Sequence, residues 1–133
     1  MNVLNSIFTV ALLATFSACS SQTQNPSSPN VINLTTAEFA DIINNGGVLI
    51  DVRTPGEYGE THIENAIALD YYSNDFENNA ASLPKDKAIY VYCKSGGRSA
   101  SASKILLEQG HKQVYNLKGG INGWRSAGLP TVQ

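Results

Sequence analysis

Cys93 is the residue of this chain best placed to act as a nucleophile. It follows the apolar run Ala88–Tyr92, whose β-branched and aromatic side chains predict a buried strand, and it precedes Arg98–Gln109, whose apolar spacing predicts a helix. In a glycine-containing turn between a strand and a helix, backbone N–H groups point inward and the helix start adds partial positive charge. Because such a field stabilises a thiolate, the sequence predicts a reactive cysteine rather than a small, inert core residue.

The residues after this cysteine favour the binding of an anion, and they are Lys94, Ser95, Gly96, Gly97, Arg98 and Ser99. The lysine favours an anionic substrate, with a merely solvated charge as the alternative. The arginine either orients that anion or pairs with a carboxylate that braces the loop. The glycines are expected to let N–H groups converge without Cβ clashes, and the serines to donate hydrogen bonds or cap the helix. We call residues 93–99 the Cys93 loop.

Alternating strands and helices are expected to hold this loop. Strands are predicted at Val31–Leu34, Val48–Val52, Ala66–Leu69, Lys87–Tyr92 and Val114–Leu117, and helices at Thr35–Asn44, Asp75–Ala81, Arg98–Gln109 and Ile121–Ala127. Thr35 and Glu38 form a capping box for the first helix. The alternation predicts an α/β fold with a mainly parallel, five-stranded sheet and helices on both faces. Functional sites of such sheets lie at the carboxyl ends of the strands, where Asp51 and Arg53 should meet Cys93.

Four segments together resemble the motifs of one family: Asp51–Tyr58 (D-V-R-x-x-x-E-Y/F), Thr61–Ala66 (G-H-I-x-G-A), Cys93–Arg98 (C-x-x-G-x-R) and Leu117–Pro130 (L-x-G-G…W…G-L/Y-P). The second segment departs from its motif, because Thr61 and Asn65 stand where glycine is usual. On these motifs the chain, from Val31 onward, is similar to a single-domain rhodanese, which is a rhodanese-like sulfurtransferase.

The resemblance implies sulfur transfer through a persulfide on Cys93. The thiolate would take sulfane sulfur from an anionic donor such as thiosulfate and pass it to cyanide, a small thiol or a protein thiol, with no metal and no organic cofactor. The Cys93 loop would stabilise the terminal sulfur in the manner of an oxyanion hole. Asp51 is expected to fix Arg53 or Arg98 by a charge-assisted hydrogen bond, and a general-base role for Asp51 is the alternative.

Other functions use similar residues. Phosphatases and arsenate reductases of related fold have C-x5-R loops, whereas four residues separate Cys93 from Arg98 here. A binding or sensor module without a persulfide would be marked by loss of the loop cysteine, which is present. A redox role lacks a nearby resolving cysteine. Neither histidine is expected to act as a base, because His62 suits a structural hydrogen bond and His111 follows a glycine in a turn, where we expect it to be exposed.

Composition limits the partners of the chain. Its 133 residues, net charge of −2 and 42% hydrophobic content indicate one domain that does not bind nucleic acid or a membrane surface through charge. Small-molecule sulfur donors and acceptors, or a protein thiol, are the expected partners. A single domain gives no reason for an oligomer, so a monomer is expected.

The N-terminal residues predict export. Residues 1–18 have the apolar character of a signal peptide, and Thr15–Cys19 resembles a bacterial lipobox, which predicts lipidation of Cys19. Residues 19–30 are rich in Ser, Gln, Asn and Pro and are expected to be a flexible tether to a domain at 31–133. We therefore expect a lipoprotein on the periplasmic side of a bacterial membrane, held there only by its lipid, with a soluble periplasmic protein as the alternative. Lipidation would leave Cys93 as an unpaired thiol.

Overall fold

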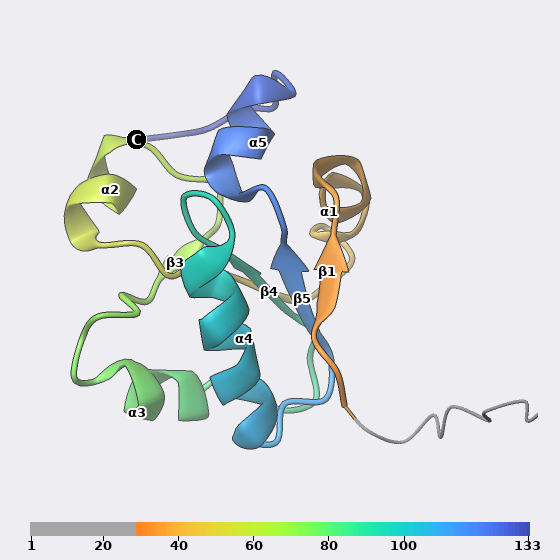
Figure 1. The fold of residues 1–133 in the computed structure, drawn as a ribbon, viewed down its shortest axis with the longest axis vertical. Coiled ribbons are helices and arrows are strands. Elements are labelled where there is room, and N and C mark those ends of the chain that lie inside the picture. The colour runs from red at the N-terminus through yellow and green to blue at the C-terminus, as the bar shows by residue number, and fades with distance from the viewer. Residues whose placement is uncertain (1–28) are drawn as a thin grey trace, which may run out of the picture.

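The computed structural model describes residues 29–133, in which strands and helices alternate (Figure 1). In chain order the elements are β1 (Ile32–Leu34), α1 (Thr36–Ile42), β2 (Val48–Asp51), α2 (Pro55–Glu60), β3 (Ile67–Ala68), α3 (Phe76–Ala81), β4 (Ile89–Tyr92), α4 (Gly97–Glu108), β5 (Val114–Leu117) and α5 (Gly120–Ser126). The predicted signal peptide and Cys19 belong to residues 1–28, which lie outside the described residues. Within residues 29–133, no helix combines the length and apolar character needed to cross a membrane.

All five strands pair in parallel, in the order β1-β5-β4-β2-β3. This arrangement confirms the predicted five-stranded parallel sheet. β4 lies in the middle and all of its residues are buried, which accounts for its continuous apolar run. Because β2 and β4 are neighbours with Asp51 paired to Tyr92, the residues that follow both strands emerge at the same edge of the sheet. That edge brings the two motif segments together, as the alternating pattern predicts.

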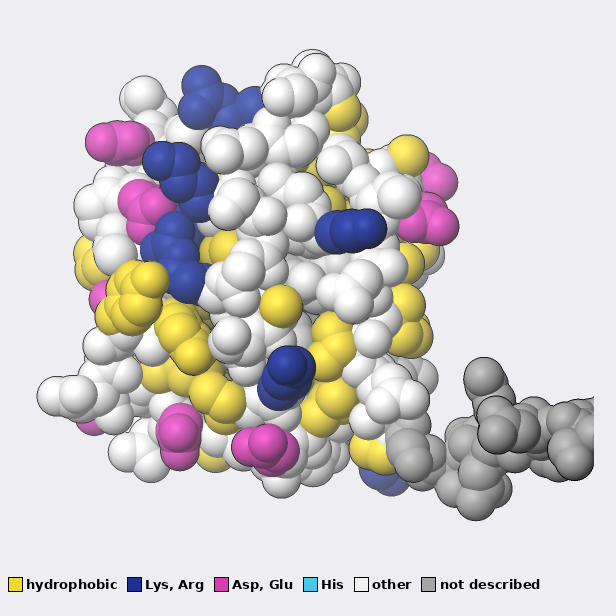
Figure 2. Space-filling view, viewed as in Figure 1, with side chains coloured by type: hydrophobic (Ala, Val, Ile, Leu, Met, Phe, Trp, Pro, Cys, Tyr) yellow, Lys and Arg dark blue, Asp and Glu magenta, His cyan; other side chains and the backbone are white. Residues whose placement is uncertain are grey.

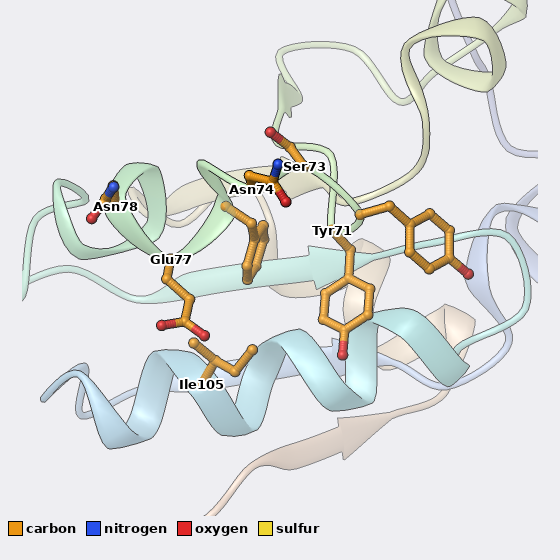
Figure 3. Close-up of a pocket in the computed structure, with 8 residues that line it drawn as sticks. Tyr71, Ser73, Asn74, Glu77, Asn78 and Ile105 are labelled. Atoms are coloured by element: carbon orange, nitrogen blue, oxygen red, sulfur yellow. The ribbon is translucent and has the colours of Figure 1, made fainter.

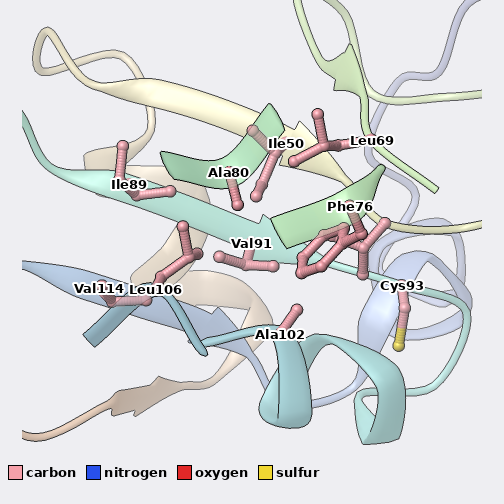
Figure 4. Close-up of a cluster of buried hydrophobic side chains, with 11 residues drawn as sticks. Ile50, Leu69, Phe76, Ala80, Ile89, Val91, Cys93, Ala102, Leu106 and Val114 are labelled. Atoms are coloured by element: carbon pink, nitrogen blue, oxygen red, sulfur yellow. The ribbon is translucent and has the colours of Figure 1, made fainter. Parts of the chain in front are cut away.

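Side chains alternate between the two faces of the sheet, and helices cover both faces. Ile89, Val91 and Cys93 belong to a cluster that includes side chains of α3 and α4, and Figure 4 shows Cys93 at the edge of this cluster. Tyr90 and Tyr92 belong to a second cluster with side chains of α1 and α5. Cys93 thus continues the alternation of β4 and begins the loop from a buried, fixed position.

The predicted elements agree with the structure to within two residues at each end, with one omission. The capping box of Thr35 and Glu38 is present at the start of α1. Helix α2 is absent from the sequence predictions, although it has a comparable start. Thr54 and Glu57 form a second capping box, and Pro55 occupies the first helical position, where its missing N–H costs nothing.

The predicted exposure of His111 is wrong, since the side chain is 1% exposed. Its Nε2 atom lies 3.1 Å from the carbonyl oxygen of Ala80 and 2.9 Å from Nζ of Lys85. The turn after α4 therefore folds against the end of α3 and encloses the ring. Burial lowers the pKa of His111, which keeps the imidazole neutral at pH 7.

Candidate active site

Cys93 lies directly after β4 and is 1% exposed. Its Sγ atom accepts a hydrogen bond from the N–H of Gly96 at 3.1 Å and another from the hydroxyl of Ser99 at 3.3 Å. Burial raises the pKa of the Cys93 thiol, but hydrogen bonds from Ser99, Gly96 and Ser95 together outweigh burial and leave the pKa below its ordinary value. The loop therefore favours the thiolate form of this cysteine.

The turn between β5 and α5 fixes the loop from outside. Gly96 has a φ of +106°, and a Cβ atom there would overlap the carbonyl oxygen of Lys118. A Cβ atom at Gly120 would likewise overlap the loop backbone at Lys94. Backbone N–H groups at the start of α5 donate hydrogen bonds to two loop carbonyls at 2.9 and 3.1 Å. Because these carbonyls are held outward, the loop can turn its own N–H groups toward the sulfur.

Arg98 forms a bidentate ion pair with Glu57. Its Nη1 and Nη2 atoms donate to Oε2 and Oε1 at 2.8 and 2.9 Å, which joins the first turn of α4 to the first turn of α2. The hydrogen bonds from Arg98, helped by those from Thr54, outweigh burial and lower the pKa of Glu57 to about 2. Of the two interpretations of Arg98, the structure contains the pairing with a carboxylate. Glu57 is a site residue that the sequence reasoning missed, although it is the glutamate of the first motif.

Asp51 and Arg53 form a second, fully enclosed ion pair, with the two residues 0% and 5% exposed. The guanidinium donates to both carboxylate oxygens, at 2.6 to 3.1 Å, and to the carbonyl of Thr61 at 2.6 Å. It also lies 5.7 Å from the ring centre of Tyr92, the last residue of β4. Asp51 therefore fixes Arg53 rather than Arg98, and the pair ties the end of β2 to the segment after α2.

The connection from α2 to β3 accommodates both departures from the family motif. Asn65 has a φ of +66°, so it adopts the left-handed conformation that a glycine would supply. Thr61 has an extended backbone with a φ of −167°, which needs no glycine. The Nδ1 atom of His62 lies 3.0 Å from the carbonyl oxygen of Tyr58, and its ring stacks on that of Tyr58 at 3.9 Å. These contacts give His62 the structural hydrogen bond expected from the sequence.

The other predicted loop residues occupy different environments. Lys94 and Ser95 are exposed, so the lysine ammonium is open to an incoming anion. Ser99 is buried, and its hydroxyl also lies 3.1 Å from the carbonyl oxygen of Gly96. Gly97 is the first residue of α4 and has open space where a Cβ would stand, so the turn itself does not require glycine at this position.

This arrangement combines a thiolate, converging N–H and O–H donors, and an exposed cation. Such a site can form a covalent bond through sulfur and stabilise negative charge on an atom attached to it. Among residues 29–133, Cys93 is a free thiol, and no group of three His, Cys, Asp or Glu side chains is placed to hold a metal ion.

Comparison with known proteins gives consistent matches over most of the chain. Residues 35–127 match the family described as Rhodanese-like domain. A protein of Allochromatium vinosum named "Sulfurtransferase" is 39% identical over 85 residues, which cover 64% of this chain and 78% of that protein. "Thiosulfate sulfurtransferase 16, chloroplastic" of Arabidopsis thaliana is 34% identical over 113 residues, or 77% of this chain and 92% of that protein.

A solved structure agrees with these matches. The crystal structure of a rhodanese-related protein from Thermoplasma volcanium superimposes with a TM-score of 0.68 at 30% identity, covering 76% of this chain and 97% of that one. The fold and the sequence motifs thus point to the same family.

Proposed function

The chain belongs to the rhodanese-like domain family, and from this premise we propose that it is a sulfurtransferase that carries sulfur as a persulfide on Cys93. The donor in this proposal is an anion such as thiosulfate, and the acceptor is cyanide or a thiol. The observation that carries the proposal is the convergence of the Gly96 N–H and the Ser99 hydroxyl on the Cys93 sulfur.

The first half of the reaction loads the enzyme. The Cys93 thiolate attacks the outer sulfur of thiosulfate, a new S–S bond forms, and the bond between the two sulfurs of the donor breaks. Its electron pair leaves with sulfite, so the three negative charges of the reactants are kept among the products. The exposed ammonium of Lys94 is suited to attract the dianionic donor.

The second half returns the thiolate. A nucleophile such as cyanide attacks the terminal sulfur of the persulfide, and the electron pair of the broken S–S bond returns to Cys93. The N–H groups of the loop stabilise the negative charge that the terminal sulfur bears between the two halves. No step in this scheme needs a metal or an organic cofactor.

The two ion pairs act in this proposal as positioning groups. The pair of Arg98 with Glu57 holds the start of α4, and the buried pair of Asp51 with Arg53 holds the neighbouring strand end. Neither arginine needs to touch the donor for the loop to work. A rigid loop keeps the donors at hydrogen-bond distance from the sulfur, which is the condition for strong electrostatic stabilisation.

Initial-rate kinetics test this function. With thiosulfate and cyanide as varied substrates, a persulfide mechanism predicts parallel double-reciprocal lines and thiocyanate as product. Intersecting lines would contradict a free persulfide intermediate. Aryl phosphates should not be hydrolysed, because a loop with four residues between Cys93 and Arg98 is shorter than the loops of phosphatases.

The proposed location is the periplasmic side of a membrane, through lipidation of Cys19. The support for it is the lipobox-like sequence Thr15–Cys19 and the polar composition of residues 20–30. Labelled palmitate should enter the wild-type protein expressed in a bacterium and not the variant Cys19→Ser. Equal labelling of both would contradict this site, and cleavage without any label would favour a soluble periplasmic protein.

A further inference from the structure

A groove lies between the β3–α3 connection and α4, on the face that Figure 2 shows, where hydrophobic side chains gather. Its volume is about 600 Å³, and its walls include Tyr71, Tyr72, Phe76, Glu77 and Ile105. We call it the aromatic groove. Its volume falls in the range of sites that bind small organic molecules.

The groove adjoins the site through Tyr72. The guanidinium carbon of Arg98 lies 5.6 Å from the ring centre of Tyr72, so one ring contributes both to the groove and to the surroundings of the Cys93 loop. Phe76, at the other wall, belongs to the same buried cluster as Cys93. The groove is therefore linked to the Cys93 loop through the contact between Tyr72 and Arg98.

The walls favour a cation. Tyr71 packs edge to face with Tyr72, at a centre distance of 5.7 Å, and with Phe76, at 5.4 Å. Figure 3 shows Tyr71 and Glu77 both extending toward α4, with the carboxylate of Glu77 close to Ile105. Aromatic ring faces and a carboxylate both attract positive charge, and none of the residues lining the groove is a lysine or arginine. The contact of Tyr72 with Arg98 is an example of such attraction within the protein itself.

We propose that the aromatic groove binds the protonated amino group of a small sulfur acceptor, so that the preferred acceptor is an aminothiol. This inference rests on the proposed persulfide function. The thiol of the acceptor gives its proton to the anionic terminal sulfur of the persulfide, and the resulting thiolate attacks that sulfur. The bond between the terminal sulfur and Cys93 Sγ breaks, and its electron pair returns to Cys93, which becomes a thiolate. The transferred sulfur keeps the proton and leaves as the persulfide of the acceptor.

The test follows the second half of the reaction alone. The full chain is loaded with thiosulfate, freed of donor, and mixed with cysteamine, 2-mercaptoethanol or 3-mercaptopropionate, which carry a positive, no or a negative charge beside the thiol. The loss of persulfide gives a rate constant for each acceptor. Comparing the rate ratio of cysteamine to 2-mercaptoethanol between protein variants cancels the intrinsic reactivity of each thiol.

The variants are Glu77→Gln and Tyr71→Leu, with Glu108→Gln as a matched loss of one exposed carboxylate on α4 that does not line the groove. Glu77→Gln should lower the ratio by about threefold to tenfold, as expected for an exposed charge pair assisted by aromatic rings, and Tyr71→Leu should lower it as well. Glu108→Gln should leave it unchanged.

An unchanged ratio in both groove variants would overturn the proposal, and so would an equal fall in the control. If Glu77→Gln lowers the rate constant for a basic peptide thiol but not the rate constant for cysteamine, the assignment of a small acceptor is wrong. The loading step separates this inference from the function on which it rests. Failure of wild-type protein to form any persulfide would contradict the proposed function, whereas normal loading without discrimination among acceptors would contradict only the groove assignment.

Discussion

Replacing Glu57 by Gln should weaken the domain and its activity together. The substitution keeps the size of the side chain and one oxygen that can accept a hydrogen bond, but it removes the charge that Arg98 contacts at 2.8 and 2.9 Å. A carboxyl whose pKa falls from 4.5 to about 2 on folding contributes at most about 3 kcal/mol to the free energy of unfolding. Since solvent reaches both partners and screens them, we expect a loss of about 1–2 kcal/mol at pH 7.

The loss of unfolding free energy in Glu57→Gln should become smaller at low pH. The folded pKa of Glu57 is depressed, so its charge stabilises the protein fully above pH 4.5, and this contribution is lost as the pH falls toward about 2. The difference between wild type and Glu57→Gln should therefore be constant from pH 7 to pH 5 and shrink between pH 4.5 and pH 3. Urea unfolding at each pH measures it. We also expect kcat to fall by about tenfold to a hundredfold, because Arg98 no longer holds the start of α4 in place.

Glu38→Gln is the matched control. Glu38 occupies the same position in the capping box of α1, where its partner is Thr35 and no arginine contacts it. This variant should lose less stability than Glu57→Gln and keep full activity. The stabilising role of the Glu57 carboxylate would be refuted if Glu57→Gln were as stable as wild type at pH 7. A loss that stays constant down to pH 3 would also refute it, since it would not come from the carboxylate.

Two further predictions concern the Cys93 loop. Gly96→Ala should lower the free energy of unfolding by about 2–4 kcal/mol and abolish activity, because Gly96 has a φ of +106° and a Cβ there would overlap the carbonyl of Lys118. Gly97→Ala should fold normally, and its free energy of unfolding in urea should rise by up to about 1 kcal/mol. Equal effects of the two alanines would contradict the described loop. Ser99→Ala should raise the pKa of Cys93, measured as the pH dependence of iodoacetamide alkylation, because the thiolate loses its hydroxyl donor at 3.3 Å. A pKa unchanged by this substitution would mean that backbone N–H groups alone stabilise the thiolate.

Much of the fold was predictable because local signals agree with it. The run Ala88–Tyr92 is apolar throughout because both faces of β4 are covered, and the Thr35–Glu38 capping box marks the start of α1. The Cys93 loop was predictable for the same reason: a strand, a glycine turn and a helix start follow each other within a few residues. Such signals need no knowledge of the rest of the structure.

The parts that escaped prediction depend on distant residues. Helix α2 has only six residues, so its apolar pattern is too short to show a helical period. It also includes Pro55 and Gly56, which are typical of turns. Glu57 belongs to the first motif, but it meets Arg98 across 41 positions of sequence, and nothing local predicts that contact. His111 follows a glycine as exposed residues often do, but the end of α3 covers it. These contacts are set by the packing of elements, which the sequence pattern does not contain.

Sulfur transfer through Cys93 is tested most directly by the intact mass of the protein after incubation with thiosulfate, beside the variant Cys93→Ser. A persulfide on Cys93 predicts a gain of about 32 Da, the mass of one sulfur atom, in the wild-type protein only, and its removal by cyanide with release of thiocyanate. The same gain in Cys93→Ser would assign the persulfide to another residue. No gain from thiosulfate, mercaptopyruvate or a persulfide donor would contradict sulfur transfer through Cys93.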